Sequence, residues 1–426
     1  MTKSKKIHTL ATYFDSNILF LKWTAFWIYD DETTTSKKYL QYAYNIFWFF
    51  FLFVAYQPAE LLYVYYSFND LSVFLRALRD IGNHISLAYK AFNYFIMRKD
   101  IFQLMDTLQH GNYHYEDYKN FQPKLIVNEE KKQALKWTKY FLNFCNALCV
   151  SMLANGVFTF LFMSDTQYVE KNGQLVYQQK QPINTVSPFG SGTKLQFVIT
   201  FVYTMMALSF YAWMIVALDS LFITIMSCIS GHLKILQGAF KTIRARCIMR
   251  TKMERLLKEE TLHDPPFLVD CVDKEMVRCI KHLQIVLSVS EKLESIYSTQ
   301  TCIQTFISLG EMCFSLYLLS ETADQNMGNE LTYLTATAFE LLLYCWFGNR
   351  ITEASLKVSY AMYESDWFPT SSSCKKQIIF TMTRMQKPIN VTIGKITPLT
   401  FSTFLTMARG AYSFFTFLKQ RHGINH

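Results

Sequence analysis

Charged residues lie within several long apolar stretches of this sequence. Four of them are Asp219, Glu311, Glu340 and Arg409. A charge inside a bilayer is costly, so such residues usually pair with one another, face water or take part in function. Glu311 and Arg409 fall at similar depths along their stretches. We therefore expect them to form an ion pair, which either serves function or only holds the helices together.

A row of polar residues follows the last apolar stretch at steps of four and three. Its members are Ser402, Thr406, Arg409, Ser413, Thr416 and Gln420. These steps place all six on one face of a helix, with phenylalanine and leucine on the other faces. A polar face within lipid has to meet protein or water. The row therefore indicates either close helix packing through small hydroxyl residues or the wall of an aqueous pore.

Motifs of enzymes and metal sites are absent from the sequence. It contains no phosphate-binding G-x-x-x-x-G-K-[ST], no H-E-x-x-H and no G-x-S-x-G. His110 and His114 have the spacing of two metal ligands on a helix, but Gly111 between them favours a loop. We therefore expect no catalytic residue, no metal site and no cofactor.

The composition is that of a chain that crosses a membrane several times. Of its 426 residues, 51% are hydrophobic and only 18% are charged, whereas soluble domains have about 25% charged residues. Seven stretches approach the ~20 apolar residues that a transmembrane helix needs. These predicted spans are approximately 40–65, 71–96, 135–163, 195–226, 294–320, 331–352 and 393–418.

Two stretches near the N-terminus are less clear. The span 71–96 is interrupted by Arg76, Arg79, Asp80, His84 and Lys90. Its apolar residues keep helical spacing, so it is either a span with one side facing protein or water, or a surface helix. The short aromatic segment Ile18 to Tyr29 contains Lys22 and suits a helix at the membrane surface.

The distribution of lysine and arginine predicts the orientation. With the N-terminus inside, the inner segments hold 30 of these residues and the outer segments hold 5, as the positive-inside rule requires. The formal charge of +9 is thereby explained without nucleic acid. We predict an all-α membrane protein with seven transmembrane helices, a cytoplasmic N-terminus, an extracellular C-terminus and a cytoplasmic helical anchor.

The loops differ in character. Residues 227–293 contain two amphipathic helices separated by Asp264-Pro265-Pro266. They form either a solvated loop near anionic lipid or a subunit-assembly domain, because apolar faces outside a bilayer need a partner. The polar outer loop 164–194 is predicted to form a short hairpin or lid.

The C-terminal third resembles the insect odorant receptors. The likeness lies in Leu341 to Phe368 and in Thr383 to Lys419. The matching residues are Tyr344, Gly348, Ser355, Tyr363 and Trp367, then Lys387-Pro388, Phe404 and Tyr412-Ser413-Phe414-Phe415. The remainder is similar in layout only. The predicted orientation is opposite to that of G-protein-coupled receptors.

The resemblance implies a ligand-gated, non-selective cation channel that assembles as a tetramer with a co-receptor subunit. The last span would line the pore through Ser402, Thr406, Arg409, Ser413, Thr416, Phe417 and Gln420. Cys374 to Gln386 would form a short anchor helix. A bare arginine in a cation pore raises a barrier. Arg409 therefore either turns toward Glu311 or comes from one subunit in four.

The resemblance also implies a ligand pocket in the outer half of the bundle, between the second, third, fourth and sixth spans. Depth and direction give the candidates Phe74, Leu78, Ile81, Ile85, Ser151, Ala154, Asn155, Phe158, Tyr203, Met206, Ser209, Tyr333, Thr337 and Glu340. Apart from Glu340 this set is uncharged, which favours a neutral organic ligand.

The chain is accordingly predicted to divide into six parts. These are 1–39 (cytoplasmic N-terminus with an interfacial helix), 40–226 (spans one to four, most of the ligand-binding bundle), 227–293 (cytoplasmic anchor loop), 294–352 (spans five and six), 353–392 (cytoplasmic loop and short anchor helix) and 393–426 (pore-lining span and C-terminus).

We expect a multi-pass protein of the plasma membrane of olfactory sensory neurons, with a co-receptor subunit, a small hydrophobic odorant or pheromone and the lipid bilayer as partners. A gustatory-type receptor channel is the nearest alternative. A seven-span transporter or membrane enzyme that uses Asp219, Glu311 and Glu340 is a more distant one.

Overall fold

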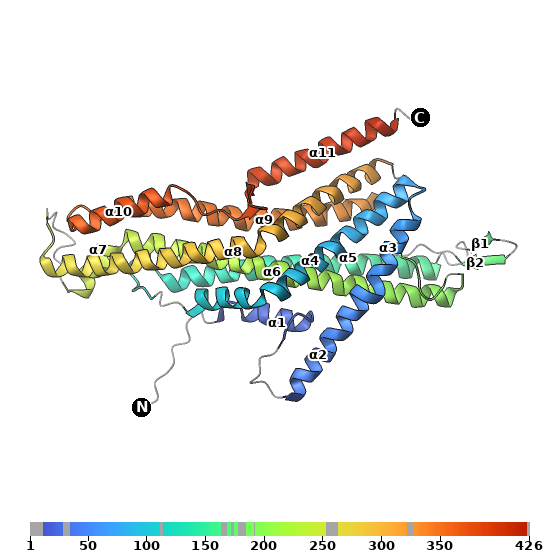
Figure 1. The fold of residues 1–426 in the computed structure, drawn as a ribbon, viewed down its shortest axis with the longest axis horizontal. Helices are drawn as coiled ribbons and strands as arrows, with labels where there is room; N and C mark the ends of the chain where they lie inside the picture. The colour runs from blue at the N-terminus through green and yellow to red at the C-terminus, as the bar shows by residue number, and fades with distance from the viewer. Residues whose placement is uncertain are drawn as a thin grey trace.

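The computed structural model describes residues 12–28, 35–110, 114–162, 168–171, 174–177, 185–190, 192–252, 263–321 and 327–423. This part of the chain is an elongated bundle of long helices (Figure 1). The helices are α1 (Asp15–Trp23), α2 (Thr35–Phe49), α3 (Gln57–Tyr66), α4 (Leu71–His110), α5 (Pro123–Phe162), α6 (Lys194–Lys241), α7 (Ile243–Arg250), α8 (Pro266–Glu321), α9 (Met327–Tyr363), α10 (Ser372–Met385) and α11 (Phe401–Gly423). A π-helical segment, η2 (Phe50–Tyr56), joins α2 to α3.

Each predicted span lies on one of these long helical segments. By length and composition, four described segments are apolar enough to cross a membrane, namely Ser36–Tyr66, Pro123–Phe162, Lys194–Lys241 and Pro266–Glu321. The helices α4, α9 and α11 carry more polar residues. In α4 these include Arg79, Asp80 and Lys90, which are buried against neighbouring helices rather than facing lipid.

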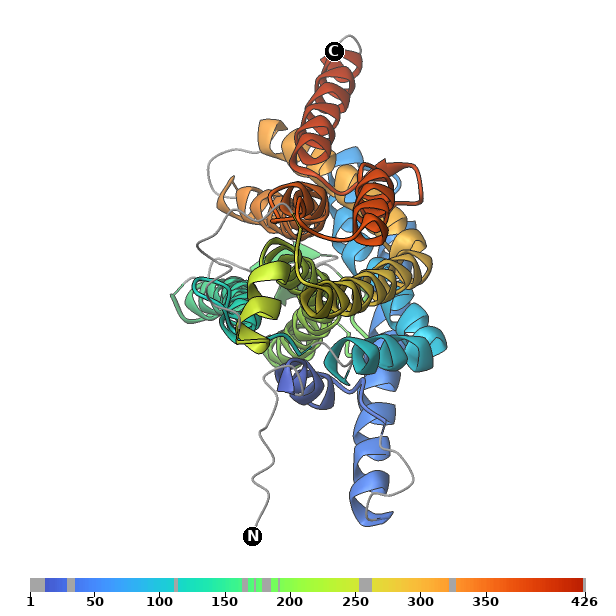
Figure 2. The same ribbon diagram turned by 90° about the vertical axis from the view of Figure 1, so that its left-hand side faces the viewer.

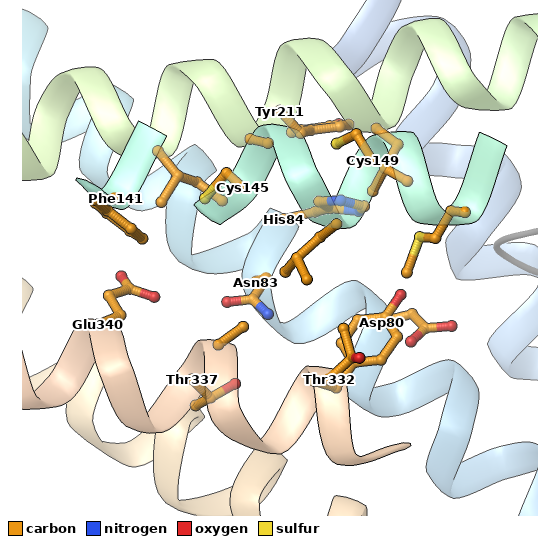
Figure 3. Close-up of a pocket in the computed structure, with 17 residues that line it drawn as sticks. Asp80, Asn83, His84, Phe141, Cys145, Cys149, Tyr211, Thr332, Thr337 and Glu340 are labelled. Atoms are coloured by element: carbon orange, nitrogen blue, oxygen red, sulfur yellow. The ribbon is translucent and has the colours of Figure 1, made fainter. Parts of the chain in front are cut away.

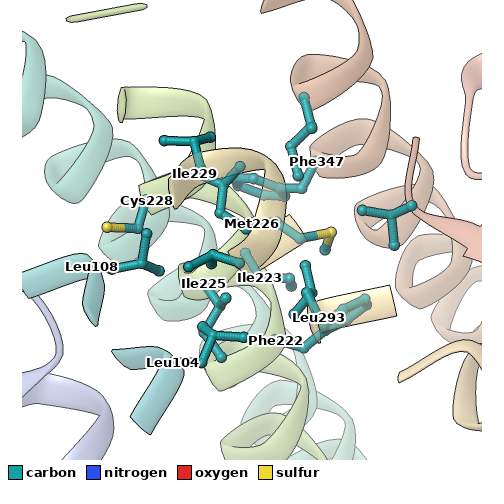
Figure 4. Close-up of a cluster of buried hydrophobic side chains, with 14 of the residues drawn as sticks. Leu104, Leu108, Phe222, Ile223, Ile225, Met226, Cys228, Ile229, Leu293 and Phe347 are labelled. Carbon is teal, nitrogen blue, oxygen red and sulfur yellow. The ribbon is translucent and has the colours of Figure 1, made fainter. Parts of the chain in front are cut away.

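The helix α6 forms the centre of the bundle. Its residues from Val216 to Leu236 are almost all buried, and a helix that is buried on every side lies in the core. Figure 4 shows its side chains packed against Leu104 and Leu108 of α4, Leu293 of α8 and Phe347 of α9. The apolar core therefore extends along α6 beyond the predicted span 195–226.

Two helices are much longer than a bilayer is thick. The helix α6 has 48 residues and α8 has 56. At about 1.5 Å per residue they extend about 70 and 85 Å, against about 30 Å for the hydrocarbon core. Their ends beyond the spans pack with α7, α10 and the end of α9 into what we call the extramembrane helical region (Figure 1).

The helix α8 begins at the second of two consecutive prolines. Pro266 is its first residue, where a missing N–H does no harm. Asp264, just before it, accepts a hydrogen bond of 2.7 Å from Arg244 of the extramembrane helical region. The hydrogen bonds that Arg244 donates to Asp264 and Asp366 raise its pKa, and burial, which lowers it, has the smaller effect.

A buried chain of hydrogen bonds ties the extramembrane helical region together. Nε2 of His232 lies 3.1 Å from the carbonyl oxygen of Leu108, Nδ1 of His232 lies 3.0 Å from Nε2 of His282, and Nδ1 of His282 lies 3.0 Å from the Tyr115 hydroxyl. A carbonyl only accepts, so for neutral rings each histidine donates through Nε2 and Tyr115 donates to His282. Burial lowers the pKa of His232 to about 4 and that of His282 well below its usual value.

The last helix begins at Phe401, later than the predicted start at residue 393. Residues 392–398 instead form an antiparallel pair of two-residue strands, β3 (Thr392–Ile393) and β4 (Thr397–Pro398). The turn between them needs positive φ at Gly394 and Lys395. The Gly394 N–H donates to the Ser298 carbonyl at 3.0 Å. The apolar residues of this segment therefore pack against α8 rather than continuing the helix.

Smaller elements differ from the prediction in detail. The helix α1 ends at Trp23, before Tyr29, because Ala25 has a φ of 63°. It packs against α6, where Asn17 donates to the Ser220 hydroxyl at 3.4 Å. In the outer loop, β1 (Tyr168–Lys171) and β2 (Gln174–Tyr177) pair antiparallel, with Tyr168 opposite Tyr177, which confirms the predicted hairpin.

Candidate ligand cavity and last helix

A cavity of about 130 Å³ lies between α4, α5, α6 and α9 (Figure 3). These helices carry the second, third, fourth and sixth predicted spans, the set expected to form a pocket. The lining residues are Asp80, Asn83, His84, Phe141, Cys145, Leu148, Cys149, Met152, Leu208, Tyr211, Ala212, Ile215, Thr332, Tyr333, Ala336, Thr337 and Glu340.

One wall of the cavity is apolar. On α5 it is formed by residues spaced three and four apart, among them Phe141, Cys145, Leu148 and Met152, which places them on one helical face. On α6 the largest contribution is the Tyr211 ring, which stacks on His84 with 3.9 Å between ring centroids. Sulfur-containing side chains are polarizable and adapt to irregular shapes. This wall therefore suits the hydrocarbon part of a ligand.

The opposite wall, from α4 and α9, contains titratable groups that are already paired. Asp80 accepts a hydrogen bond of 2.9 Å from Arg79, and Nδ1 of His84 lies 2.7 Å from a Glu60 carboxylate oxygen. The Glu340 carboxylate accepts a hydrogen bond of 2.8 Å from Lys90. Each charge at the cavity thus has a partner behind it, as a buried charge requires.

The Lys90 ammonium joins two carboxylates. It is 2% exposed and donates to Asp219 and to Glu340, each at 2.8 Å. Asp219 also accepts from the Tyr344 hydroxyl at 2.7 Å. The charges that interrupt the predicted second span therefore hold α4, α6 and α9 together, and the alternative of a surface helix for 71–96 is wrong.

Three of the predicted ligand residues, Tyr333, Thr337 and Glu340, line this cavity. The others do not, although all of them lie on the helices that surround it. They are Phe74, Leu78, Ile81, Ile85, Ser151, Ala154, Asn155, Phe158, Tyr203, Met206 and Ser209.

The difference is one of helical face. Ser151 and Asn155 on α5 are exposed on the outside of the bundle, as is Met206 on α6. Neighbouring residues point about 100° apart around a helix. A predicted residue that is one position away from a lining residue therefore faces a different side of the helix. The lining residues Cys145, Cys149 and Met152 could have been found as a sulfur-rich row at helical spacing. Asp80 and His84 are four residues apart on α4, and this helical spacing could have identified them as residues on one face.

The polar row on α11 points away from the rest of the chain. Ser402, Thr406, Arg409, Ser413 and Gln420 are exposed, and Thr416 is partly buried. Phe417, the seventh predicted pore residue, is also exposed. The residues of α11 that are buried are instead Thr403 and Ala411, on the side that packs on α8 and α9. Both views show α11 at the outer edge of the bundle, opposite α2 (Figures 1 and 2).

The predicted Glu311–Arg409 ion pair is not formed. Glu311 is 2% exposed, and its carboxylate accepts a hydrogen bond of 3.1 Å from Thr337 of α9. It also faces Gly82 of α4, where an added Cβ would lie 2.9 Å from a Glu311 oxygen. Glu311 thus points into the bundle, whereas Arg409 points out of it and forms no ion pair with the described residues. Similar positions along two helices do not imply that the side chains face each other.

The part of the chain that the structure describes contains no group of three or more histidine, cysteine, aspartate or glutamate residues that could hold a metal ion. His110 is the last residue of α4 and pairs with Asp106 at 2.8 Å.

Comparison with known proteins gives consistent matches. The family model described as 7tm Odorant receptor matches residues 70–412. Odorant receptor 10 of Aedes albopictus is 27% identical over 151 residues, 35% of this chain and 40% of the relative. Odorant receptor 2a of Drosophila melanogaster is 24% identical over 228 residues, 52% of this chain and 55% of the relative. The matches thus span about half or less of these relatives' length.

The fold resembles that of a solved insect receptor over nearly its whole length. The insect olfactory receptor OR5 from Machilis hrabei, solved in complex with eugenol, aligns with a TM-score of 0.73 and 16% identity. The alignment covers 96% of this chain and 98% of that chain. It confirms the predicted helical membrane fold. Because the family model matches more than half of the chain, this protein belongs to the insect odorant receptor family.

Proposed function

We propose that this chain is the odour-selective subunit of a ligand-gated, non-selective cation channel in the plasma membrane of olfactory neurons. A small hydrophobic molecule binds in the cavity between α4, α5, α6 and α9, and α11 lines the pore of a tetramer formed with a co-receptor subunit. The observation that carries this proposal is the cavity, whose apolar wall and paired charges suit an uncharged organic guest.

The volume of the cavity limits the ligand. At about 130 Å³ it is close to the ~150 Å³ of an apolar cavity that holds benzene. The ligand is therefore a compact molecule near the size of one aromatic ring. The related receptor from Machilis hrabei was solved in complex with eugenol, which supports binding of a small organic compound in this fold.

The exposure of the polar row supports a pore-lining role for α11. A polar helix face that its own chain leaves uncovered is stabilised by water or by polar groups of neighbouring subunits, not by lipid. Arg409 forms no ion pair with the described residues, so four copies around one axis would place four positive charges along the ion path. We propose that co-receptor subunits reduce this number.

The helix α9 connects the cavity to α11. It contributes Thr337 and Glu340 to the cavity and, two turns later, Gly348, which packs on Leu399 just before α11. Ligand binding shifts the channel toward the open state only if the open state binds it more tightly. We propose that such a difference in affinity acts through a movement of α9.

Assembly is proposed to involve the extramembrane helical region. Ile379 and Phe380 on α10 are 66% and 80% exposed, although they lie beyond the predicted spans. Apolar side chains that face water mark an interaction surface. We propose that they contact neighbouring subunits.

The test is current recording from cells that express this chain with a co-receptor subunit, using a panel of compact odorants. Filling the cavity with Ala212→Trp is expected to abolish the responses, because Ala212 lines the cavity. The matched control is Ala147→Trp on the exposed side of α5, which is expected to keep them. Two results contradict the proposal. One is silence of surface-expressed wild-type channels across the panel, and the other is equal responses of the wild type and the Ala212→Trp variant.

A further inference from the structure

Two polar groups at the cavity have no hydrogen-bond partner among the described residues. The Asn83 amide lines the cavity and points into its middle (Figure 3), and it forms no hydrogen bond with a described residue. The Tyr333 hydroxyl is buried at the same cavity and also lacks a partner. A buried donor that is left unpaired, as the Tyr333 hydroxyl is, costs free energy. The Asn83 amide is partly buried beside the same cavity, so both groups are set up to meet a ligand.

Their neighbours on the same wall differ in this respect. Asp80, His84 and Glu340 are each paired with a charged or titratable group, and the Thr337 hydroxyl donates to Glu311. These groups therefore need no ligand to satisfy them. Asn83 and Tyr333 are therefore two described groups of this wall that keep unused hydrogen-bonding capacity.

The position of the Tyr333 ring is fixed by α4. The Arg79 guanidinium lies over this ring, 3.9 Å from its centroid. Arg79 is itself held by Asp80, at 2.9 Å, and by Glu330. Since Asn83 follows Arg79 by one helical turn, the same helix positions both unpaired groups. Such preorganisation lowers the entropy cost of binding.

From these contacts we infer that the cavity selects a compact hydrocarbon carrying one uncharged oxygen function, such as an alcohol, phenol, aldehyde or ketone. The Tyr333 hydroxyl and the Asn83 amide nitrogen donate to the ligand oxygen, and the Asn83 carbonyl accepts from a ligand hydroxyl where there is one. The hydrocarbon part lies against the α5 and α6 wall. This inference rests on the proposed function and adds the class of ligand and the two residues that select it.

Charged ligands fit less well. An ammonium ligand would face Asp80 and Glu340, but these carboxylates already form ion pairs with Arg79 and Lys90. A carboxylate ligand would find no uncommitted cation among the described lining residues. An uncharged polar group avoids the cost of desolvating a new charge.

The experiment compares ligands of nearly equal size that differ in one group. Toluene, benzyl alcohol, benzaldehyde, benzylamine and benzoate are applied to the channel formed with the co-receptor, and the half-maximal concentration is measured for each. The wild type is expected to respond to benzyl alcohol or benzaldehyde at concentrations about tenfold lower than to toluene, the effect of one or two neutral hydrogen bonds.

Variants then assign the preference to the two residues. Tyr333→Phe and Asn83→Leu are each expected to remove most of the preference for oxygenated ligands while the response to toluene is kept. The matched control, Tyr65→Phe at an exposed position of α3, should leave the preference intact. Because the wild-type comparison needs no variant, it remains decisive if a variant fails to reach the cell surface.

The outcomes separate this inference from the proposed function. Equal potency of toluene and its oxygenated counterparts, or a preference that survives in both variants, overturns the inference and leaves the channel function standing. A preference for benzylamine overturns it as well and shows that the carboxylates select the ligand. Silence of surface-expressed wild-type channels to a broad odour panel contradicts the proposed function, and the inference with it.

Discussion

At the scale of single residues, Lys90 links charged groups on three helices. It is buried and forms ion pairs with Asp219 and Glu340 on two other helices. Removing one member of a buried ionic group leaves its partners charged and unpaired, which costs about 3–5 kcal/mol. The group therefore stabilises the packing of α4, α6 and α9 only as a complete set.

We predict that Lys90→Met lowers the melting temperature of the purified receptor and its abundance at the cell surface. In this variant the carboxylates of Asp219 and Glu340 would lie close together without the cation that both contact in the wild type. The control is Lys281→Met, at an exposed position on α8, which should change neither measurement. Adding Asp219→Asn and Glu340→Gln to Lys90→Met should restore part of the loss. A Lys90→Met protein as stable as the wild type would show that the group contributes little.

The buried pair His232 and His282 gives a prediction of pH dependence. The pKa of His232 is lowered by burial to about 4 in the folded chain, whereas an unfolded histidine has a pKa of about 6.5. Protonation thus favours the unfolded state. The stabilisation is complete above pH ~6.5 and is lost as the pH falls toward 4, by about 3 kcal/mol in all.

This is measured as the free energy of unfolding of detergent-solubilised protein between pH 7.5 and 4. His232→Gln should flatten the decline, whereas His110→Asn, at an exposed position, should not. A wild-type profile that is level across this range would mean that other groups compensate the histidines.

At the scale of elements, the contact between α9 and the segment before α11 depends on Gly348. A Cβ added there would lie 2.6 Å from the Leu399 carbonyl oxygen and 2.7 Å from the Leu399 Cβ. Backbone atoms cannot move aside as a flexible side chain can. Any side chain at this position therefore has to push Leu399, and with it the start of α11, away from α9.

Gly348→Ala is accordingly expected to destabilise the receptor by about 1–3 kcal/mol and to reduce the ligand-evoked current at equal surface expression. Gly328→Ala near the start of α9 is the matched control, because an added Cβ there has nothing within 4 Å. Melting temperature and current are measured in parallel. Wild-type behaviour of Gly348→Ala would show that this contact can relax.

The positions of the helices could be predicted from the sequence, but the side of each helix that faces the cavity could not. Apolar stretches of about 20 residues identify membrane helices with little ambiguity. Which side of α5 faces the cavity depends on its rotation and tilt, and the exposed Asn155 and the lining Cys149 are equally compatible with a span. The start of α11 was missed because Ile393 and Leu399 are as apolar as the helix that follows. The turn at Gly394 was the available signal.

At the scale of the whole molecule, two surfaces of the single chain are suited to contacts with other chains. One is the polar row of α11, and the other is the apolar surface at Ile379 and Phe380 on α10. The family resemblance implied a subunit of an assembly from the sequence alone, and the amphipathic helices of residues 227–293 allowed a subunit-assembly domain as one of two interpretations. The uncovered side of α11 was not predictable, because the sequence does not say against which helices that face packs.

We predict that Phe380→Glu reduces the fraction of tetrameric complexes formed with the co-receptor, because a charge replaces an apolar contact. Met249→Glu on α7, another exposed apolar position of the extramembrane helical region, serves as the control. Particle mass in detergent, measured for co-purified complexes, gives the stoichiometry. Unchanged tetramers with Phe380→Glu would exclude this surface from the subunit interface.

The unbroken length of α6 has a mechanical consequence. One continuous rod of 48 residues carries cavity residues such as Tyr211 in its first half and the His232 hydrogen bond in its last quarter. A rod about 70 Å long that pivots by about 5° around one end displaces the other by about 6 Å. A guest that tilts this helix slightly would therefore produce a displacement at the far end larger than its own adjustment at the cavity. Spectroscopic probes placed at the two ends of α6 would register that amplification directly.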